Sequence, residues 1–535
     1  MQTLTKFALV GTAKQPAAAV AADGHPTDEL SQRLPPDDVE GAFLLRSALQ
    51  AVYGQAGKRA VTGVAAVEPA EREADRIGSR KLAGMLQHVF DTGATELLIE
   101  FLRPMEGSGI VIPYDLLPQA LDCSDAAVRE RLLPVLGARG NWLARQNDAW
   151  SWVTDGVSTL TKTNVELLKQ TWEEGTFAER RQALETLRRS NPAEAREWLS
   201  SDMPREKADH RARLLAACEL GLSPEDEPFL ETCLDDRSLV VTRTAAGLLA
   251  RIPASALSRR MRERADAMFT TESKGLLKKK LRLVSNPPEQ IDKDWERDGI
   301  ASKPPAGSGK RAHWTVTLLA SIPPSHWTAR FDVPADQLIN AVEGDNFAGA
   351  ILSGWTHAAA IFAADDVESA TWLWPLWKEW SAAAEREKGK GRAEAIAHLS
   401  SLLPLLSLAD AENALTGLLE SSKKEAQGDL LGLLTEVDRP WSTAFAMKYL
   451  NVVRAVLKKQ KDNSAYLWAN TLSTAGSALP EEAFAAALAD WQIAESDSTW
   501  HVEAARREVE KFCDTVQMRK SFLEELQTSA SHATG

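Results

Sequence analysis

The sequence has little of what marks disulfide-rich, zinc-binding or membrane proteins. Only 4 of its 535 residues are cysteines, and they form no CxxC pair, so the sequence predicts neither a disulfide framework nor a zinc site. No window approaches the roughly 18 apolar residues that a membrane span needs. We therefore expect a protein of the reducing cytoplasm that makes no contact with a membrane.

The motifs of common active sites are also missing. The sequence contains neither the HExxH pattern of zinc proteases nor the GxSxG pattern of serine hydrolases. Residues 304–311 (PPAGSGKR) have a Gly-rich run before a lysine, but Pro304 replaces the first glycine of a phosphate-binding loop and Arg311 replaces the Ser or Thr that follows the lysine. We interpret this segment as a flexible linker.

Isolated polar residues have simpler explanations than catalysis. His357 lies on an apolar helix, where a core or boundary histidine is a better interpretation than a metal ligand. The pairs Asp235–Asp236 and Asp365–Asp366 lie where helices are expected to begin, so helix capping explains them. The sequence thus predicts no catalytic residue, no cofactor and no metal, and we expect that the protein is not an enzyme.

What the chain does contain favours a folded, all-α protein. Hydrophobic residues make up 44% of the chain and charged residues 26%, as in globular proteins. Ala, Leu, Glu and Arg are abundant whereas Tyr numbers only 4, and this balance favours helices over sheets. No segment requires a strand. The expected fold class is therefore all-α.

The clearest pattern is a repeat between about residues 178 and 269. Apolar positions recur every 31 residues, each within a helix that is followed by a short turn and a second helix. The equivalent positions are Leu184, Leu215 and Ala246, and again Leu187, Cys218 and Leu249. A proline in each turn, at Pro192, Pro224 and Pro253, is expected to open the second helix. Because a short helix pair cannot bury its own apolar face, neighbouring pairs must stack, as in a HEAT-like α-solenoid or an irregular helical-repeat superhelix.

Composition divides the chain into four parts. Residues 1–177 predict an irregular helical region, residues 178–285 hold the helix pairs, and residues 286–312 form a linker rich in Pro, Lys, Asp and Gly. Helical periodicity returns in residues 313–535, which we expect to be a C-terminal helical domain. Four tryptophans there lie within nine residues, and we favour core packing for them over an exposed stacking platform. They are Trp372, Trp374, Trp377 and Trp380.

The net charge of −13 hides one basic stretch. Residues 251–282 contain ten Lys or Arg and three acids. Such a stretch is able to dock a phosphate backbone or an acidic protein surface, although a solvated helix face is the simpler interpretation. The candidate partner-binding residues are Arg259, Arg260, Arg262, Arg264, Lys278, Lys279, Lys280 and Arg282.

Three blocks resemble an uncharacterised bacterial family, a domain of unknown function that is largely helical and HEAT-like. They are residues 8–14 (ALVGTAK), residues 133–144 (LPVLGARGNWLA) and residues 221–231 (GLSPEDEPFLE). One feature departs from the typical HEAT turn, in which Arg directly follows Val: here Thr242 follows Val241, and the arginine is Arg243. The sequence therefore leaves open whether the contacts between successive repeats that this arginine usually makes are present here.

The resemblance implies partners rather than chemistry. Members look, from their usual gene company, like partners of MoxR-type AAA+ ATPases, von Willebrand factor A proteins and SWIM zinc-finger proteins, and the family has no catalytic residues to carry over. Our first hypothesis is therefore a non-enzymatic scaffold or adaptor that binds protein partners through a helical-repeat surface. The alternative is a HEAT-like nucleic-acid-binding protein or a DNA glycosylase-like enzyme that uses the basic stretch, and the acidic remainder of the chain disfavours it. An unrecognised hydrolase is the third and weakest hypothesis.

Overall fold

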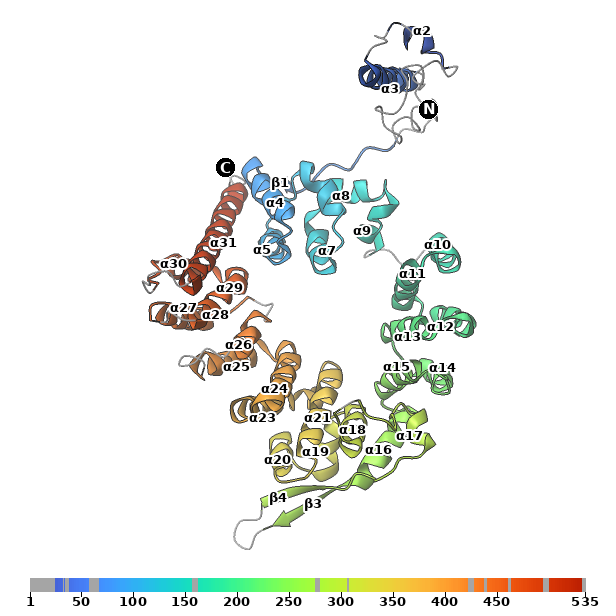
Figure 1. The fold of residues 1–535 in the computed structure, drawn as a ribbon, viewed down its shortest axis with the longest axis vertical. Coiled ribbons are helices and arrows are strands. Elements are labelled where there is room, and N and C mark those ends of the chain that lie inside the picture. The colour runs from blue at the N-terminus through green and yellow to red at the C-terminus, as the bar shows by residue number, and fades with distance from the viewer. Residues whose placement is uncertain are drawn as a thin grey trace. The chain divides into compact units, whose positions relative to one another are not determined.

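The computed structural model forms two compact units, residues 1–70 and residues 71–535. The structure describes residues 25–31, 33, 38–56, 67–155, 162–274, 280–305, 307–421, 428–436, 440–459, 463–493 and 500–531 (Figure 1). Among these residues, no helix combines the length and hydropathy that crossing a membrane requires. The resembling block at residues 8–14 lies outside the described residues.

The first unit contains the helices α2 (Asp28–Ser31) and α3 (Val39–Ala56). The carboxylate of Asp38 accepts a hydrogen bond from the backbone N–H of Gly41 at 2.8 Å and so caps the start of α3. The buried Arg46 forms an ion pair with Asp28 at 2.8 Å, which ties the two helices together.

The second unit begins with short helices and a small parallel sheet around one apolar core. The elements are β1 (Arg76–Ile77), α4 (Arg80–Thr92), α5 (Thr95–Met105), β2 (Ile110–Val111), α6 (Leu117–Leu121), α7 (Ala126–Leu132), α8 (Gly137–Ala144) and α9 (Trp152–Asp155). Gly137 opens α8 at a φ of 67°, a left-handed conformation that suits glycine. Gly140 lies within α8, where a Cβ atom would come within 2.8 Å of Leu136, so close packing requires the glycine.

The repeat region consists of successive helix pairs. Its elements are α10 (Lys162–Glu174), α11 (Phe177–Ser190), α12 (Pro192–Asp202), α13 (Ala208–Ala216), α14 (Glu227–Cys233), α15 (Leu239–Ala250) and α16 (Ala256–Met268). The 31-residue interval places Leu184 in α11, Leu215 in α13 and Ala246 in α15, and all three are buried. The helices α11, α13 and α15 contact one another in turn, so the first helices of successive pairs stack as predicted.

Two of the three turn prolines behave as predicted. Pro192 is the first residue of α12, and Pro224 opens a short 3-10 helix, Pro224–Asp226, that leads into α14. Pro253 does not open α16. That helix begins at Ala256, because the side chain of Ser255 caps it by accepting a hydrogen bond from the backbone N–H of Ser258.

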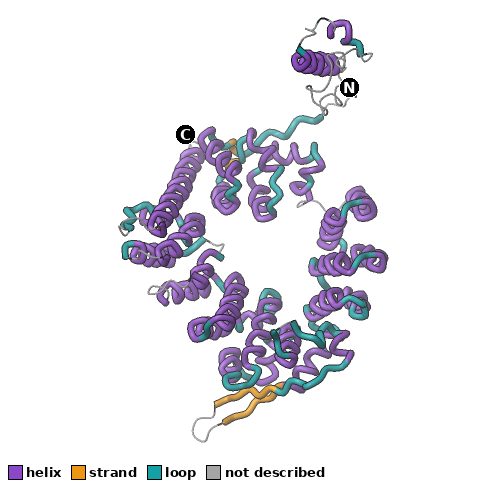
Figure 2. Tube along the Cα trace, viewed as in Figure 1, coloured by secondary structure: helices purple, strands orange, loops and turns teal. Residues whose placement is uncertain are grey.

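An antiparallel hairpin follows the repeat region and corrects the expectation that no strand is present. Strand β3 (Phe269–Lys274) pairs with β4 (Lys280–Ser285), and Figure 2 shows this hairpin in orange. The fold class remains all-α, because the sheets of the described residues are small. Helix α17 (Lys293–Arg297) lies within residues 286–312, the segment predicted to be a linker. The division of the chain into four parts stays a prediction.

The next segment buries most of its tryptophans. Its helices are α18 (Lys310–Ala320), α19 (Ser325–Phe331), α20 (Ala335–Ala341), α21 (Ala348–Phe362), α22 (Val367–Ala370), α23 (Leu373–Arg386) and α24 (Gly389–Leu402). Trp372, Trp377 and Trp380 are buried, and Trp374 is half-buried. Core packing is therefore confirmed for three of the four tryptophans.

The last helix joins two apolar cores. The final helices are α25 (Leu408–Ser421), α26 (Gly428–Leu431), α27 (Thr443–Leu457), α28 (Asn463–Asn470), α29 (Leu472–Ala478), α30 (Phe484–Ala487) and α31 (Trp500–Ser531). Phe512 in α31 packs into the large core that begins at Trp172. Further along α31, Phe522 stacks on Phe101 of α5 with ring centroids 4.0 Å apart, and Arg519 forms an ion pair with Glu100 at 2.8 Å.

Buried ion pairs connect successive helix pairs in the repeat region. Arg188 of α11 and Asp226, which precedes α14, are both fully buried, and two hydrogen bonds of 2.9 and 3.0 Å join them. Arg196 of α12 donates to the same carboxylate at 2.6 Å. Burial alone would raise the pKa of Asp226, but the hydrogen bonds from the two arginines outweigh it and lower the pKa, so the carboxylate stays ionised.

A second arginine–aspartate contact of this kind starts from α13, the first helix of the next pair. Arg211 of α13 donates two hydrogen bonds of 2.7 and 2.8 Å to Asp236, which lies between α14 and α15. Successive pairs are thus linked by arginine–acid contacts, although Arg243 is not the residue that makes them. The contacts between helix pairs that a HEAT-turn arginine usually makes are therefore made here by Arg188 and Arg211.

We predict that Asp226→Asn loosens the repeat region. The substitution leaves Arg188 buried without its counter-charge, and removing one partner of a buried pair costs about 3–5 kcal/mol. Hydrogen–deuterium exchange is expected to accelerate in α11 to α14 and to stay unchanged in α27. Asp209→Asn is the matched control, because its ion pair with Arg213 is exposed. Equal exchange in the two variants would contradict a stabilising role for the buried pair.

Candidate interaction surface

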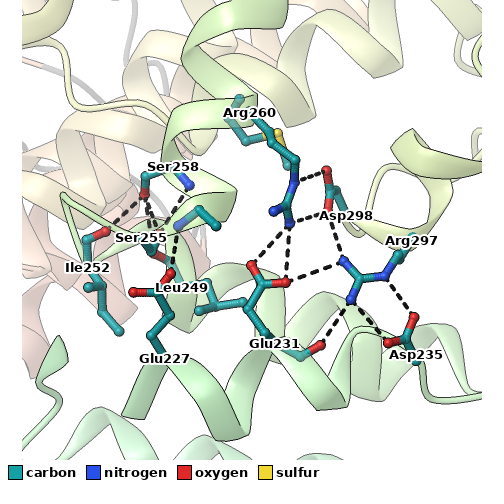
Figure 3. A network of polar contacts seen from close by, with 12 residues as sticks. Glu227, Glu231, Asp235, Leu249, Ile252, Ser255, Ser258, Arg260, Arg297 and Asp298 are labelled. Atoms are coloured by element: carbon teal, nitrogen blue, oxygen red, sulfur yellow. Dashed lines mark hydrogen bonds and ion pairs between the residues drawn. The ribbon is translucent and has the colours of Figure 1, made fainter. Parts of the chain in front are cut away.

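Two arginines of the basic stretch, Arg260 and Arg264, contact an acidic network (Figure 3). Its centre is Asp298, which follows α17 and is only 2% exposed. Arg260 of α16 donates two hydrogen bonds to this carboxylate, at 2.7 and 2.9 Å. Arg264, one helical turn further along α16, forms an ion pair with it at 2.7 Å. One buried acid therefore occupies two of the predicted partner-binding arginines.

Helix α14 supplies the other acids of the network. Arg260 contacts Glu231 at 3.1 Å, and Arg297 of α17 contacts the same carboxylate at 3.3 Å. Arg297 also donates two hydrogen bonds to Asp235, at 2.7 and 3.0 Å, which lower the pKa of Asp235. The hydrogen bonds that the arginines donate, to Asp298 from Arg260 and to Asp235 from Arg297, raise the pKa of both guanidinium groups. The network thus connects α14, α16 and α17 through arginine–carboxylate contacts.

The start of α16 is held by a second set of contacts visible in Figure 3. The hydroxyl of Ser255 donates to the carbonyl of Leu249 at 2.8 Å, and the backbone N–H of Ala256 donates to Glu227 at 2.7 Å. Glu227 belongs to α14, so this contact also joins neighbouring helix pairs. Helix α16 is therefore anchored at both its first turn and its middle.

The remaining predicted residues are divided between internal contacts and solvent. Arg262 donates to the carbonyl of Pro253 at 3.1 Å. On β4, Lys280 forms an ion pair with Glu343 at 2.5 Å, and Arg282 donates to the carbonyl of Gly344 at 3.0 Å.

Three further predicted residues complete the set. Arg259 is exposed. Lys278 and Lys279 lie outside the described residues. The structure therefore brings Arg260 and Arg264 to one acid, and the described members of the set do not form one free basic patch.

A cavity of about 990 Å³ lies next to the basic stretch. Its lining includes Arg251, Arg262, Asp365 and Asp366. Arg251 is 3.8 Å from Asp365 and 2.5 Å from Glu219, so its charge is already matched by acids. The cavity combines both signs of charge with apolar groups.

Ser325 and His326 line the same cavity, and with Asp266 they come nearest to a nucleophile–histidine–acid set. His326 contacts Asp266 at 2.8 Å, as the histidine of such a set would. Ser325, however, hydrogen-bonds the carboxylate of Asp366. Burial would raise the pKa of Asp366, but this bond and those from Ser369 lower it. Ser325 therefore has an ionised carboxylate, and not the imidazole, as its partner.

Cys218, Cys233 and His398 are buried, whereas His357 is exposed. Burial raises the pKa of Cys218 to about 12 and that of Cys233 to about 11, so both thiols stay protonated. Burial lowers the pKa of His398 to about 4 and also lowers that of His357. Within the described part of the chain, no group of three or more His, Cys, Asp and Glu side chains is placed to hold a metal ion.

The sequence did not predict that Asp298 and Glu231 would pair with arginines of the basic stretch. Asp235 and Asp236 were interpreted as helix caps, but their carboxylates accept hydrogen bonds from Arg297 and Arg211. Asp366 does cap α22, as predicted. The available signal was the spacing of arginines one turn apart on α16, which permits two of them to share one acid. The acid itself, 38 residues from Arg260, could not be found from local sequence.

We predict weak binding to duplex DNA even at low salt. Phosphate contacts would require Arg260 and Arg264 to exchange buried carboxylates for phosphates, and the rest of the chain repels the duplex. Fluorescence anisotropy of a labelled duplex titrated with the full chain measures the affinity. Binding that weakens steeply with added salt, and that is lost in Arg259→Ala, would instead support the nucleic-acid hypothesis.

Comparison with known proteins adds one relationship. No curated protein matches the chain. A family model described as "Family of unknown function (DUF5691)" matches residues 3–526, which is nearly the whole chain and includes all the networks described above. This chain therefore belongs to the DUF5691 family of unknown function.

Proposed function

We propose that this protein is a non-enzymatic scaffold or adaptor that binds protein partners through the surface of its helical repeats. The observation that carries the proposal is the set of arginine–acid contacts between successive helix pairs, from Arg188–Asp226 to Arg260–Asp298. Contacts of this kind hold neighbouring helices in fixed positions, and a preorganised surface loses little entropy on binding. Stacked helix pairs use such surfaces to bind other macromolecules.

The distribution of charge supports protein partners over nucleic acid. The net charge is −13, and three arginines of the basic stretch, Arg251, Arg260 and Arg264, are paired with acids. Cavities of about 970 and 990 Å³, lined by charged and apolar side chains together, offer the mixed surface that protein interfaces use. Within this proposal, the first partners to test are a MoxR-type AAA+ ATPase and a von Willebrand factor A protein.

The test uses purified full-length proteins from the native host. We predict that the chain binds at least one of these two partners with a micromolar or lower dissociation constant in biolayer interferometry, in the presence or absence of ATP. Cross-linking mass spectrometry of the complex should place the cross-links on helices of residues 162–421. Affinity purification from the host under cross-linking conditions extends the search to other partners.

A clear negative result would count against the scaffold. If neither purified partner binds and the host purification yields no protein above the background of an unrelated bait, the proposal fails. A steady-state activity found in a broad substrate screen, and abolished by His326→Ala with the fold intact, would favour the hydrolase hypothesis instead.

A further inference from the structure

A second cavity, of about 660 Å³, lies among α20, α21, α23 and α24, away from the basic stretch of α16. Its apolar lining comes from buried side chains of these helices and of the turn after α20. They are Ile339, Val342, Leu352, Trp380 and Ala383. The cavity therefore offers an apolar floor built on packed helices rather than on loops.

The indole of Trp380 is fixed in place by two contacts. Its N–H donates to the hydroxyl of Thr356 at 2.7 Å, and its ring stacks on His398 with centroids 4.2 Å apart. His398 is itself buried, and its neighbour His357 lies 5.4 Å away between ring centroids. Because burial lowers the pKa of both histidines, they are neutral near pH 7 and add no positive charge below the cavity.

Charge of one sign dominates the rest of the lining. Four carboxylates and one guanidinium line the cavity, which gives a local charge of −3. They are Glu343, Glu379, Glu387, Glu394 and Arg386. Arg386 contacts Glu387 at 3.3 Å. Among the described residues, neither Glu379 nor Glu394 has a cation as partner, so two carboxylates at an apolar floor are unmatched.

One carboxylate at the rim of the cavity, that of Glu343, already binds a basic side chain. Lys280 of β4 forms an ion pair with Glu343 at 2.5 Å, and Arg282 of the same strand donates to the carbonyl of Gly344. A basic strand of this chain thus already occupies one side of the rim. The unmatched Glu379 and Glu394 are left for basic groups from elsewhere.

We propose that this cavity is a docking site for a short segment of a partner protein in which Lys or Arg lies next to an apolar residue. The apolar side chain would cover the floor at Leu352 and Trp380, and the basic side chain would reach Glu379 and Glu394. The cavity holds more than one side chain, which fits a segment better than a lone cation. The inference rests on the proposed scaffold function, because it names the chemistry of a partner.

The test selects peptides from a phage-displayed random heptapeptide library on the immobilised full chain. We predict enrichment of sequences that contain Lys or Arg beside Leu, Ile or an aromatic residue. A synthetic peptide of the most enriched sequence is then titrated by isothermal calorimetry. Its affinity should fall at least tenfold in Glu379→Gln/Glu394→Gln, and it should weaken with added salt.

Two further variants make the result specific. Gly349 lines the cavity, and a Cβ atom there would meet nothing within 4 Å, so Gly349→Leu should fill the cavity without disturbing the fold. The affinity for the peptide should also fall at least tenfold in Gly349→Leu. Glu385→Gln/Glu503→Gln is the matched control, because it removes two exposed carboxylates outside the cavity. The affinity of this control variant for the peptide should stay within twofold of that of the unchanged chain.

Several results would overturn the docking site. Selection of no peptide, selection of acidic peptides, or equal affinity in all variants would each do so. Equal binding of free N-acetyl-lysine amide would indicate a site for small cations instead, and a dimer that is lost in Glu379→Gln/Glu394→Gln would indicate a second copy of this chain as occupant. The peptide selection needs no native partner. A failed partner screen with a successful selection would therefore remove the scaffold proposal without removing the site, and the reverse result would remove only the site.

Discussion

The repeat region depends on buried arginines that reach carboxylates of the neighbouring helix pair. A guanidinium in an apolar interior is costly unless its donors are matched, and Arg188 meets this requirement with Asp226 and with backbone carbonyls such as that of Leu220. The geometry of these contacts fixes the position of each pair relative to the next. Apolar stacking alone would permit small sliding movements, whereas a bidentate contact does not.

The same constraint determines where charge is available for partners. Arg260 and Arg264 are paired with the buried Asp298, so these two arginines contribute little free positive charge. Free negative charge is found elsewhere, at Glu379 and Glu394 around an apolar floor. The sequence therefore pointed to the basic stretch as the binding surface, whereas, among the described residues, unpaired carboxylates lie at Glu379 and Glu394.

Local patterns predicted the helices well and the contacts between them poorly. The 31-residue interval placed Leu184 and Leu215 in stacked helices, because burial of an apolar face repeats with the structure. The pairing of Arg260 with Asp298 joins residues 38 positions apart, and no periodicity records it. The hairpin of β3 and β4 was missed because it is short and interrupts a helical context. Core packing of Trp380 was predictable from its helical spacing, but the cavity beside it depends on α20 and α21, which are distant in sequence.

A double-mutant cycle on Arg211 and Asp236 tests most directly whether arginine–acid contacts hold successive helix pairs together. Local opening free energies of α13 and α15, from native-state hydrogen exchange, are compared for Arg211→Met, Asp236→Asn, the double variant and the unchanged chain. This account predicts a coupling energy of about 1.5–3 kcal/mol, as for hydrogen bonds between charged groups. A coupling energy near zero would contradict it and would leave apolar stacking as the interaction that orders the repeats.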